Sequence, residues 1–312
     1  MNKKILILSI ILLFLFPNSS FAVVKNSKLK NTMATVPTLA ILDTAIDNSI
    51  PEIKDKLIYE VCILQLNSCP NGSNFMEGKN SATLPLKALL KNNFSHGTSM
   101  ASAAIKSNPN MNIIFIRVIG QNVDYSRQAT SEATIWMGLD WVIQNKDIFN
   151  IQAVSMSQGS HALIEETEYC PRSLIVENKI DTLVGYGIPV FFPSGNSFDY
   201  KRIDWPACIP STISVGGATK SGIESYSNYD ASLLDFNATS QLKVALPGKS
   251  YINASGTSIS TQVAAASWLA IKYVNPTLTY TEVYNILKDT SKPVKGKQGS
   301  STMIDLPSAL NG

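Results

Sequence analysis

The chain has 312 residues, with 26 Lys and Arg against 23 Asp and Glu, which gives a formal net charge of +3. A charge this small over this length gives no basis for binding nucleic acid or an anionic membrane surface. The sequence is 45% hydrophobic and 16% charged. Together with apolar runs along the whole chain, this predicts one large globular core.

The first 22 residues have the three parts of a secretory signal peptide. Met1–Lys4 is basic, residues 5–16 are apolar apart from Ser9, and Ser20-Phe21-Ala22 offers small residues before a cleavage site. An apolar run of this length is too short for a membrane-spanning helix, which needs roughly 20 residues. We therefore expect cleavage after Ala22 and export, to a periplasm or to the medium, as a monomer without a membrane anchor.

Short apolar runs alternate with longer segments of helical pattern. The expected strands are Thr38–Ile46, Asn112–Ile119, Gln152–Ser157, Ile188–Ser194 and Thr212–Gly216, and the expected helices are His96–Lys106, Ser131–Phe149, Pro171–Tyr186, Ser258–Val274 and Thr281–Ser291. Continuously apolar strands are typical of a parallel sheet that helices cover on both faces. The alternation predicts a three-layer open α/β fold with mostly parallel strands over residues 37–312, preceded by a short extension, 23–36.

Four cysteines predict disulfide bonds in an exported chain: Cys62, Cys69, Cys170 and Cys208. Of the three possible pairings we favour Cys62–Cys69, which closes a local loop, together with Cys170–Cys208. The alternative is a metal site. The chain has no CxxC pair and only two histidines, so we expect neither a metal nor another cofactor.

Candidate catalytic residues lie where predicted strands end or helices begin, which is where active sites form in open α/β sheets. Asp43 ends the run LAIL, a place where Asp is ordinarily a turn former. His96 opens a helical segment, and the only other histidine is His161. A general base that works at neutral pH would be one of these two residues.

Two polar residues complete the candidate set. Ser258 comes directly before a long apolar helix, where it is either an N-cap or a nucleophile near the unpaired N–H groups of the helix start. Asn196 follows a predicted strand in a Gly-Asn pair, which is ordinarily a turn. Its side-chain amide could instead donate to an oxyanion.

Taken in order, five segments resemble the subtilisin-like serine proteases (subtilases, peptidase family S8): DTAID at 43–47, HGTSMA at 96–101, SMSQG at 155–159, PSGN at 193–196 and GTS at 256–258. The order Asp, His, Ser is that of subtilisin. The resemblance continues through 205–218 and 226–229, and residues 304–310 are similar to the closing strand and loop of the family. It covers essentially all of 37–312 and implies a subtilisin-like fold.

The resemblance implies a secreted serine endopeptidase acting on proteins or peptides. Asp43 would orient His96, which would take the proton of Ser258. The side chain of Asn196 and the backbone N–H of Ser258 would hold the oxyanion. Residues 97–101 also match the nucleophile pattern of the family, but Ser99 lies one helical turn from His96 and cannot converge on it from a separate element.

Residues that the resemblance places against the substrate are Ser157, Gln158, Gly159, Ser194, Gly195 and Asp204. The segment 157–159 would pair with the substrate backbone and form a wall of the first specificity pocket. Asp204, near the base of that pocket, would favour Lys or Arg before the scissile bond; the alternative is a solvent-facing Asp in a loop. The same analogy makes Trp205–Pro206 a candidate cis peptide.

The sequence departs from the family in several places. Ala45 stands where the family has Gly, so its Cβ could crowd the neighbouring backbone unless φ is negative. The nucleophile helix lacks the Met-Ala and the Pro of the family. The helix after His96 has no room for a calcium-binding loop, so we expect no calcium there. Residues 23–36 are too few for a folding pro-domain, so we expect the enzyme to fold unaided or with help from another chain.

Two other functions were weighed against the protease. A catalytically impaired subtilase that acts as a binding protein would account for Ala45 and the altered nucleophile helix. A serine esterase on another α/β fold would need G-x-S-x-G with Asp and His after the nucleophile, and no histidine follows Ser258.

Overall fold

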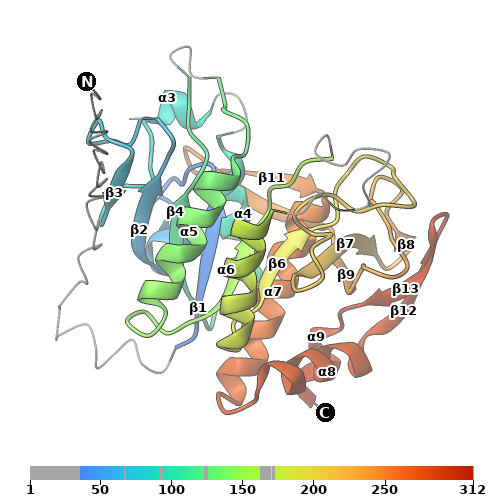
Figure 1. Cartoon of the computed structure of the whole chain (residues 1–312). Coiled ribbons are helices and arrows are strands. Elements are labelled where there is room, and N and C mark those ends of the chain that lie inside the picture. Colours follow the sequence, from blue (N-terminus) through green and yellow to red (C-terminus); the bar gives the residue numbers. More distant parts are fainter. Residues whose placement is uncertain are drawn as a thin grey trace, which may run out of the picture.

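The computed structural model describes residues 36–66, 68–90, 94–122, 126–161, 170 and 173–311. The expected signal peptide and nearly all of the expected extension 23–36 lie outside these residues. The fold is shown in Figure 1.

The strands are β1 Thr38–Asp43, β2 Leu57–Ile63, β3 Phe75–Glu77, β4 Asn112–Arg117, β5 Ile151–Met156, β6 Val190–Pro193, β7 Ile213–Thr219, β8 Gly222–Ile223, β9 Phe236–Thr239, β10 Gln241–Leu246, β11 Ser250–Ser255, β12 Lys292–Gly296 and β13 Gly299–Met303. The helices are α2 Pro51–Lys54, α3 Leu86–Leu89, α4 His96–Ser107, α5 Glu132–Asn145, α6 Leu174–Gly185, α7 Thr257–Val274, α8 Tyr280–Thr290 and α9 Leu306–Asn311.

One sheet has the order β12-β13-β9-β7-β6-β5-β1-β4-β2-β3, with β8 attached to β7, and β10 and β11 form a separate hairpin. The neighbours from β2 to β9 run parallel, and so do β9 and β13. Only β3, β8 and β12 pair antiparallel within this sheet, among the strands that the structure describes. The predicted, mostly parallel α/β fold is confirmed.

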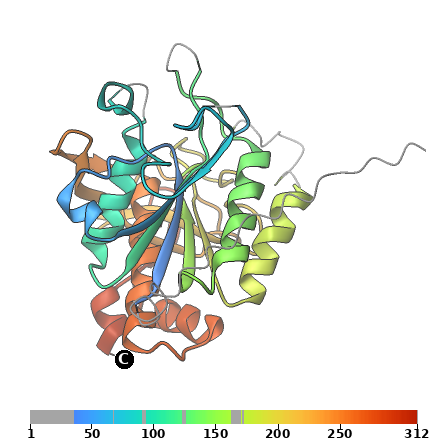
Figure 2. The same ribbon diagram turned by 90° about the vertical axis from the view of Figure 1, so that its left-hand side faces the viewer.

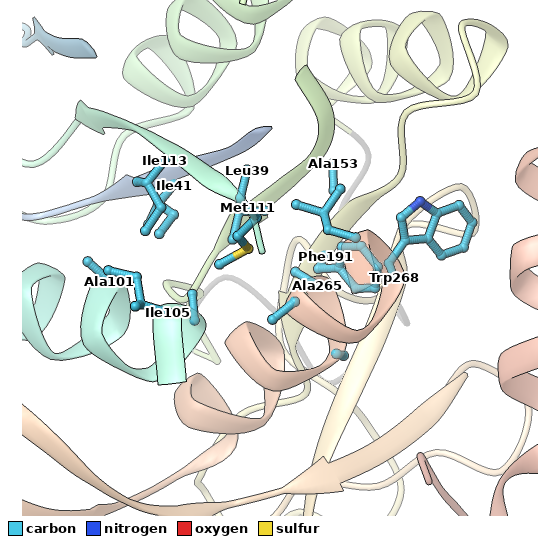
Figure 3. Packing of buried hydrophobic residues seen from close by; sticks show 14 of the residues in the cluster. Leu39, Ile41, Ala101, Ile105, Met111, Ile113, Ala153, Phe191, Ala265 and Trp268 are labelled. Carbon is cyan, nitrogen blue, oxygen red and sulfur yellow. The ribbon is translucent and has the colours of Figure 1, made fainter. Parts of the chain in front are cut away.

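Helices cover both faces of the sheet, and the central strand β1 shows why. Its side chains alternate in direction, as in any strand: Ala40 and Leu42 pack in the cluster that includes α5 and α6, whereas Leu39 and Ile41 pack in the cluster that includes α4 and α7. Figure 2 shows the sheet between these two pairs of helices. Figure 3 shows the second cluster, in which Ala101, Ile105 and Ala265 of α4 and α7 meet the sheet.

Most of the expected elements form within a few residues of their expected bounds. The expected closing strand and loop at 304–310 is wrong, because Leu306–Asn311 is helix α9. The structure also has the strand β2 and the hairpins β10–β11 and β12–β13, which are not among the expected elements. The hairpin strands are short or partly exposed, so they carry no continuous apolar run. Leu57–Ile63 is apolar apart from Glu60, so its pattern is compatible with a strand.

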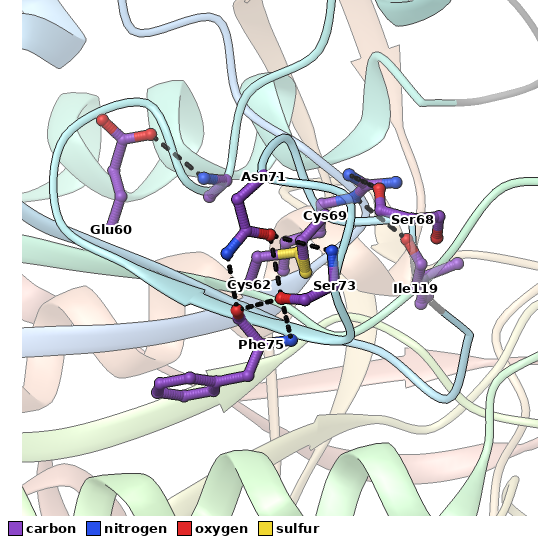
Figure 4. Close-up of a disulfide and its surroundings, with 10 residues drawn as sticks. Glu60, Cys62, Ser68, Cys69, Asn71, Ser73, Phe75 and Ile119 are labelled. Atoms are coloured by element: carbon purple, nitrogen blue, oxygen red, sulfur yellow. Dashed lines mark hydrogen bonds between the residues drawn. A yellow bond between two sulfur atoms is a disulfide. The ribbon is translucent and has the colours of Figure 1, made fainter. Parts of the chain in front are cut away.

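The structure pairs the cysteines as expected, Cys62 with Cys69 and Cys170 with Cys208. Figure 4 shows the first bond, which closes a small loop beside β3. The Trp205–Pro206 peptide is cis, as the resemblance suggested. Within the described ranges, no helix is long and apolar enough to cross a membrane, and no cluster of His, Cys, Asp and Glu is suited to hold a metal ion.

Candidate active site

Asp43 and His96 come together because β1 ends where α4 begins. Asp43 is the last residue of β1 and His96 is the first of α4. His96 Nδ1 lies 2.9 Å from Asp43 Oδ1 and 3.0 Å from Oδ2. The Asp43 side chain is fully buried, whereas that of His96 remains 25% exposed. The Nδ1 edge of the imidazole is therefore held by the carboxylate, while the ring remains partly open to the surface.

Several donors keep the Asp43 carboxylate charged. Burial alone would raise its pKa. The charge of His96 and hydrogen bonds from His96 and from the Thr44 N–H outweigh that effect, so the pKa of Asp43 is lowered. The Thr44 N–H donates to Asp43 Oδ1 at 2.7 Å. An ionised carboxylate in this position can fix the tautomer of His96 and stabilise its protonated form.

Ser258 lies in the first turn of α7, two positions after the N-cap. The N-cap is Gly256, whose φ of 148° is a backbone conformation that side chains other than glycine rarely adopt. Ser258 Oγ donates to the Ser157 carbonyl at 3.3 Å. The expectation that Ser258 might cap the helix is therefore wrong, but the residue still faces the N–H groups of the helix start.

His96, Ser258 and Asn196 line one surface cleft of about 350 Å³. The cleft also contains Arg127 and is bordered by apolar residues of the hairpin β10–β11, such as Leu246 and Ile252. A larger groove of about 800 Å³ lies near β12 and β13. It contains none of the expected catalytic residues, so we place the site in the smaller cleft.

The side chain of Asn196 is oriented by Thr257. Asn196 Oδ1 accepts hydrogen bonds from the Thr257 backbone N–H at 3.0 Å and from the Thr257 hydroxyl at 3.1 Å. With the carbonyl oxygen held in this way, the amide nitrogen points away from Thr257. Asn196 itself is exposed. The sequence motif identified Asn196 but gave no indication that Thr257 positions it.

Two doubts raised by the sequence are answered by packing. Ser99 is buried and its hydroxyl donates to the Ala245 carbonyl at 3.0 Å, so it is occupied within the core. Ala45 is not among the described residues with positive φ. Its methyl group packs with Leu84, Ala88, Leu89 and Phe94. A Cβ two positions after Asp43 is therefore accommodated.

Gln158 contacts Asp43 and His96, which the sequence did not predict. We expected it to form a wall of the substrate pocket, yet its Nε2 lies 3.2 Å from Asp43 Oδ1 and 2.9 Å from His96 Nδ1. The Arg127 guanidinium donates to its carbonyl oxygen, Oε1. No family motif contains Arg127, and only its charge at the end of a polar loop could have drawn attention to it.

The carboxylate of Asp204 lies between the two expected walls of the specificity pocket. A Cβ built on Gly195 would clash with the Asp204 carboxylate, and one built on Gly159 would lie 3.5 Å from the Asp204 Cβ. Asp204 is 8% exposed, so the alternative of a solvent-facing loop residue is wrong. Its Oδ1 accepts hydrogen bonds from Asn228 at 2.8 Å and faces His161 Nδ1 at 3.0 Å.

Burial raises the pKa of Asp204, and the hydrogen bonds and charge of His161 and the hydrogen bond of Asn228 offset this in part. The neighbouring loop depends on the same residues, because the Asp204 N–H donates to the Ser194 carbonyl and the Asn228 N–H donates to that of Gly195. Asp204 therefore supports the segment that leads to Asn196.

Residues 35–304 match the model of peptidase family S8, the subtilase family. Subtilisin amylosacchariticus of Bacillus subtilis subsp. amylosacchariticus is 25% identical over 261 residues, which are 81% of this chain and 60% of that protein. The alkaline protease of Alkalihalobacillus alcalophilus is 25% identical over 206 residues, 63% of this chain and 49% of that one. The chain thus spans about 60% of the length of the first curated relatives it matches.

Solved structures show the same fold. A cold adapted subtilisin-like serine proteinase superimposes with a TM-score of 0.64 at 21% identity, covering 88% of this chain and 89% of that one. A protease from Pseudoalteromonas arctica gives 0.70 at 18% identity, with 91% and 92% covered. At these identities the likeness supports the fold alone.

Proposed function

The chain belongs to the subtilase family, and we propose that it is a serine endopeptidase that hydrolyses proteins or peptides through an acyl-enzyme. Asp43, His96 and Ser258 are the proposed catalytic triad and Asn196 the proposed oxyanion donor. The observation that carries this proposal is the Asp43–His96 pair opening into the same cleft as Ser258 and Asn196.

In the proposed reaction, Ser258 Oγ attacks the scissile carbonyl while His96 Nε2 removes its proton. The hydroxyl must first turn away from the Ser157 carbonyl, its acceptor in this conformation. Catalytic hydrogen bonds are often made only when substrate is bound. Asp43 holds the Nδ1 side of His96 and stabilises the imidazolium that forms.

The tetrahedral oxyanion would lie at the start of α7, between the Ser258 N–H and the free amide nitrogen of Asn196. Both donors are already oriented, Asn196 by Thr257 and the N–H by the helix, so little reorganisation is needed as charge develops. His96 then returns its proton to the leaving amine, and water hydrolyses the acyl-enzyme by the same steps.

We further propose that the protein is exported. The basic and apolar N-terminal segment supports this, as do two disulfide bonds, which persist in oxidising compartments.

A fluorescent peptidyl phosphonate that reacts with activated serines tests the proposed activity. The folded wild-type protein should become labelled and hydrolyse casein, and Ser258→Ala should do neither. Ser99→Ala is the matched control, since its hydroxyl is bonded inside the core, and it should still be labelled. A folded wild-type protein that is not labelled would refute the protease and favour the binding-protein alternative.

A further inference from the structure

Arg127, Gln158 and the Asp43–His96 pair form a chain of contacts, in which Arg127 and His96 line the cleft and Gln158 and Asp43 are buried behind it. The guanidinium donates to Gln158 Oε1, and Gln158 Nε2 donates to Asp43 Oδ1. Nε2 also lies 2.9 Å from His96 Nδ1, a contact that is not a hydrogen bond while Nδ1 donates its proton to Asp43. We propose that Arg127 is a positioning residue that, through the Gln158 amide, keeps the Asp43–His96 hydrogen bond intact. This inference rests on the proposed function and assigns a role that no family motif carries.

The effect of Gln158 on Asp43 and His96 depends on which end of its amide faces them. The two ends of a glutamine amide are nearly equal in size, so the hydrogen-bond partners decide its orientation. Arg127 can only donate, and it therefore selects the orientation in which Oε1 faces it. Nε2 is then directed to Asp43 Oδ1, 3.2 Å away, where an N–H group stabilises the carboxylate.

The opposite orientation would harm the pair in two ways. Oε1 would take the place of Nε2 and lie against the ionised Asp43 carboxylate, where two oxygen acceptors repel. It would also stand 2.9 Å from His96 Nδ1 and compete with Asp43 for the proton on that nitrogen. A His96 that donates to Gln158 instead of Asp43 loses the orientation that general-base catalysis needs.

Charge supports the same arrangement. Burial lowers the pKa of Arg127 while the negative charge of Asp43 raises it, so the two groups attract each other across Gln158. Within the described residues, Gln158 Oε1 is the only side-chain acceptor with which the guanidinium forms a hydrogen bond. The amide is therefore the single link between Arg127 and the catalytic pair.

A double-mutant cycle with Arg127→Met and Gln158→Leu tests the proposal. Arg127→Met frees the amide to turn, and we expect kcat to fall about 10-fold with KM nearly unchanged, because small misplacements of catalytic groups are costly. Gln158→Leu removes the competing oxygen, so it should lose less. The double variant should be more active than Arg127→Met alone. Gln158→Leu would then lower the activity of wild type but raise that of Arg127→Met, a reversal that substitutions at independent sites do not show.

Arg127→Lys should restore most of the activity, since its ammonium can still donate to Oε1. Lys146→Met is the control for removing a cation, because Lys146 lies at the end of α5 beside Asp147, away from the cleft. A double variant less active than either single variant would overturn the proposal. So would an Arg127→Met effect confined to KM, which would instead indicate contact with substrate.

A second measurement separates this inference from the proposed function. In Ser258→Ala, the His96 Nδ1 proton should give a far-downfield NMR signal that disappears in His96→Ala. Arg127→Met should move this signal upfield as the proton leaves Asp43. Because the signal does not need turnover, an unchanged resonance would refute the positioning role even in an active enzyme, and a shifted one would support it even if wild type proved inactive.

Discussion

Ser157 and Ser258 hydrogen-bond to each other in both directions. The Ser157 hydroxyl donates to the Ser258 carbonyl at 2.9 Å, and the Ser258 hydroxyl donates to the Ser157 carbonyl at 3.3 Å. Gln262, one turn further along α7, donates to the Ser157 hydroxyl at 2.8 Å and accepts from Ser155 at 3.0 Å. The start of α7 is thus tied to the end of β5 by buried polar contacts.

Gln262→Ala should destabilise the protein by roughly 2–4 kcal/mol, because it removes the acceptor of the buried Ser155 hydroxyl and the donor to the Ser157 hydroxyl and opens a cavity. Urea denaturation measures this. Ser267→Ala is the control: it removes a hydroxyl bonded only within α7 and should change the free energy of unfolding by less than about 1 kcal/mol. An equal loss of unfolding free energy in both variants would show that the polar link between α7 and β5 does not contribute to stability.

Asn196→Ala should lower kcat by about 10²–10³-fold, a magnitude established for the oxyanion Asn of a subtilisin and thus for a relative of this chain. Thr257→Val should lower kcat by a smaller factor. It removes one of the two hydrogen bonds that orient Asn196 and keeps the backbone donor. Steady-state kinetics on a peptide amide separate the two effects. A Thr257→Val effect that persists at full size in an Asn196→Ala background would contradict this role for Thr257.

The central strands and the main helices could be predicted because local pattern and tertiary environment agree there. Thr38–Asp43 is buried along its whole length, and a strand buried on both faces shows as an unbroken apolar run. The outer hairpins could not be predicted in this way. β11 is almost entirely exposed, so its sequence has no pattern of buried apolar residues that would indicate a strand.

The candidate site was predicted only as far as its motifs extend. Asp43, His96, Asn196 and Ser258 stand in recognisable segments. Arg127 stands in none, and Thr257 lies in the GTS segment, but its contact with Asn196 depends on the folded chain. Gln158 was noticed for its place beside the substrate, and its contact with Asp43 depends on a side-chain direction that no pattern encodes. Whether Asp204 is exposed or buried could be learned only from the structure, which buries it.

The two disulfide bonds should contribute unequally to stability. Cys170–Cys208 joins residues 38 apart and Cys62–Cys69 joins residues only 7 apart. A disulfide bond stabilises a protein by constraining the unfolded chain, and this effect grows with the length of the closed loop. The expected contributions to the free energy of unfolding are about 4 kcal/mol for Cys170–Cys208 and about 2.5 kcal/mol for Cys62–Cys69. Thermal unfolding of the two paired Cys→Ser variants should therefore show the lower melting temperature when the longer loop is opened. The reverse order would mean that local strain or folded-state contacts outweigh loop length.

Stability should fall in acid because of Asp43. Its pKa is lowered in the folded protein, so its contribution is fully present above the unfolded value of about 3.9 and is lost as pH falls through the folded pKa. The pKa values of Asp47 and Asp199 are also lowered and act in the same direction. Urea denaturation between about pH 7 and pH 3 should show a shallower decline in Asp43→Asn. An identical decline would assign the acid sensitivity to other carboxylates.

Asp204 should give the enzyme a preference for Lys or Arg before the scissile bond. Its carboxylate lies against Gly195 and its Cβ lies near Gly159. Within the described part of the chain, the contacts with Asn228 and His161 engage Oδ1 alone, which leaves Oδ2 to pair with a cation. We expect kcat/KM for Arg peptides to exceed that for matched Leu peptides, and Asp204→Asn to reduce this ratio roughly 10-fold, the size of one hydrogen bond to a charged group.

Asp199→Asn is the matched control for this last prediction. Asp199 also faces His161, at 3.5 Å, but neither glycine wall approaches it, so the ratio should stay near the wild-type value. The pKa of Asp204 is raised by burial, so its carboxylate takes up a proton at a higher pH than an ordinary aspartate does. As the solution is acidified, the preference for Arg should therefore begin to weaken at that higher pH. If wild type prefers Leu, and Asp204→Asn lowers activity equally on both peptides, then Asp204 only supports the Gly195–Asn196 segment through Asn228.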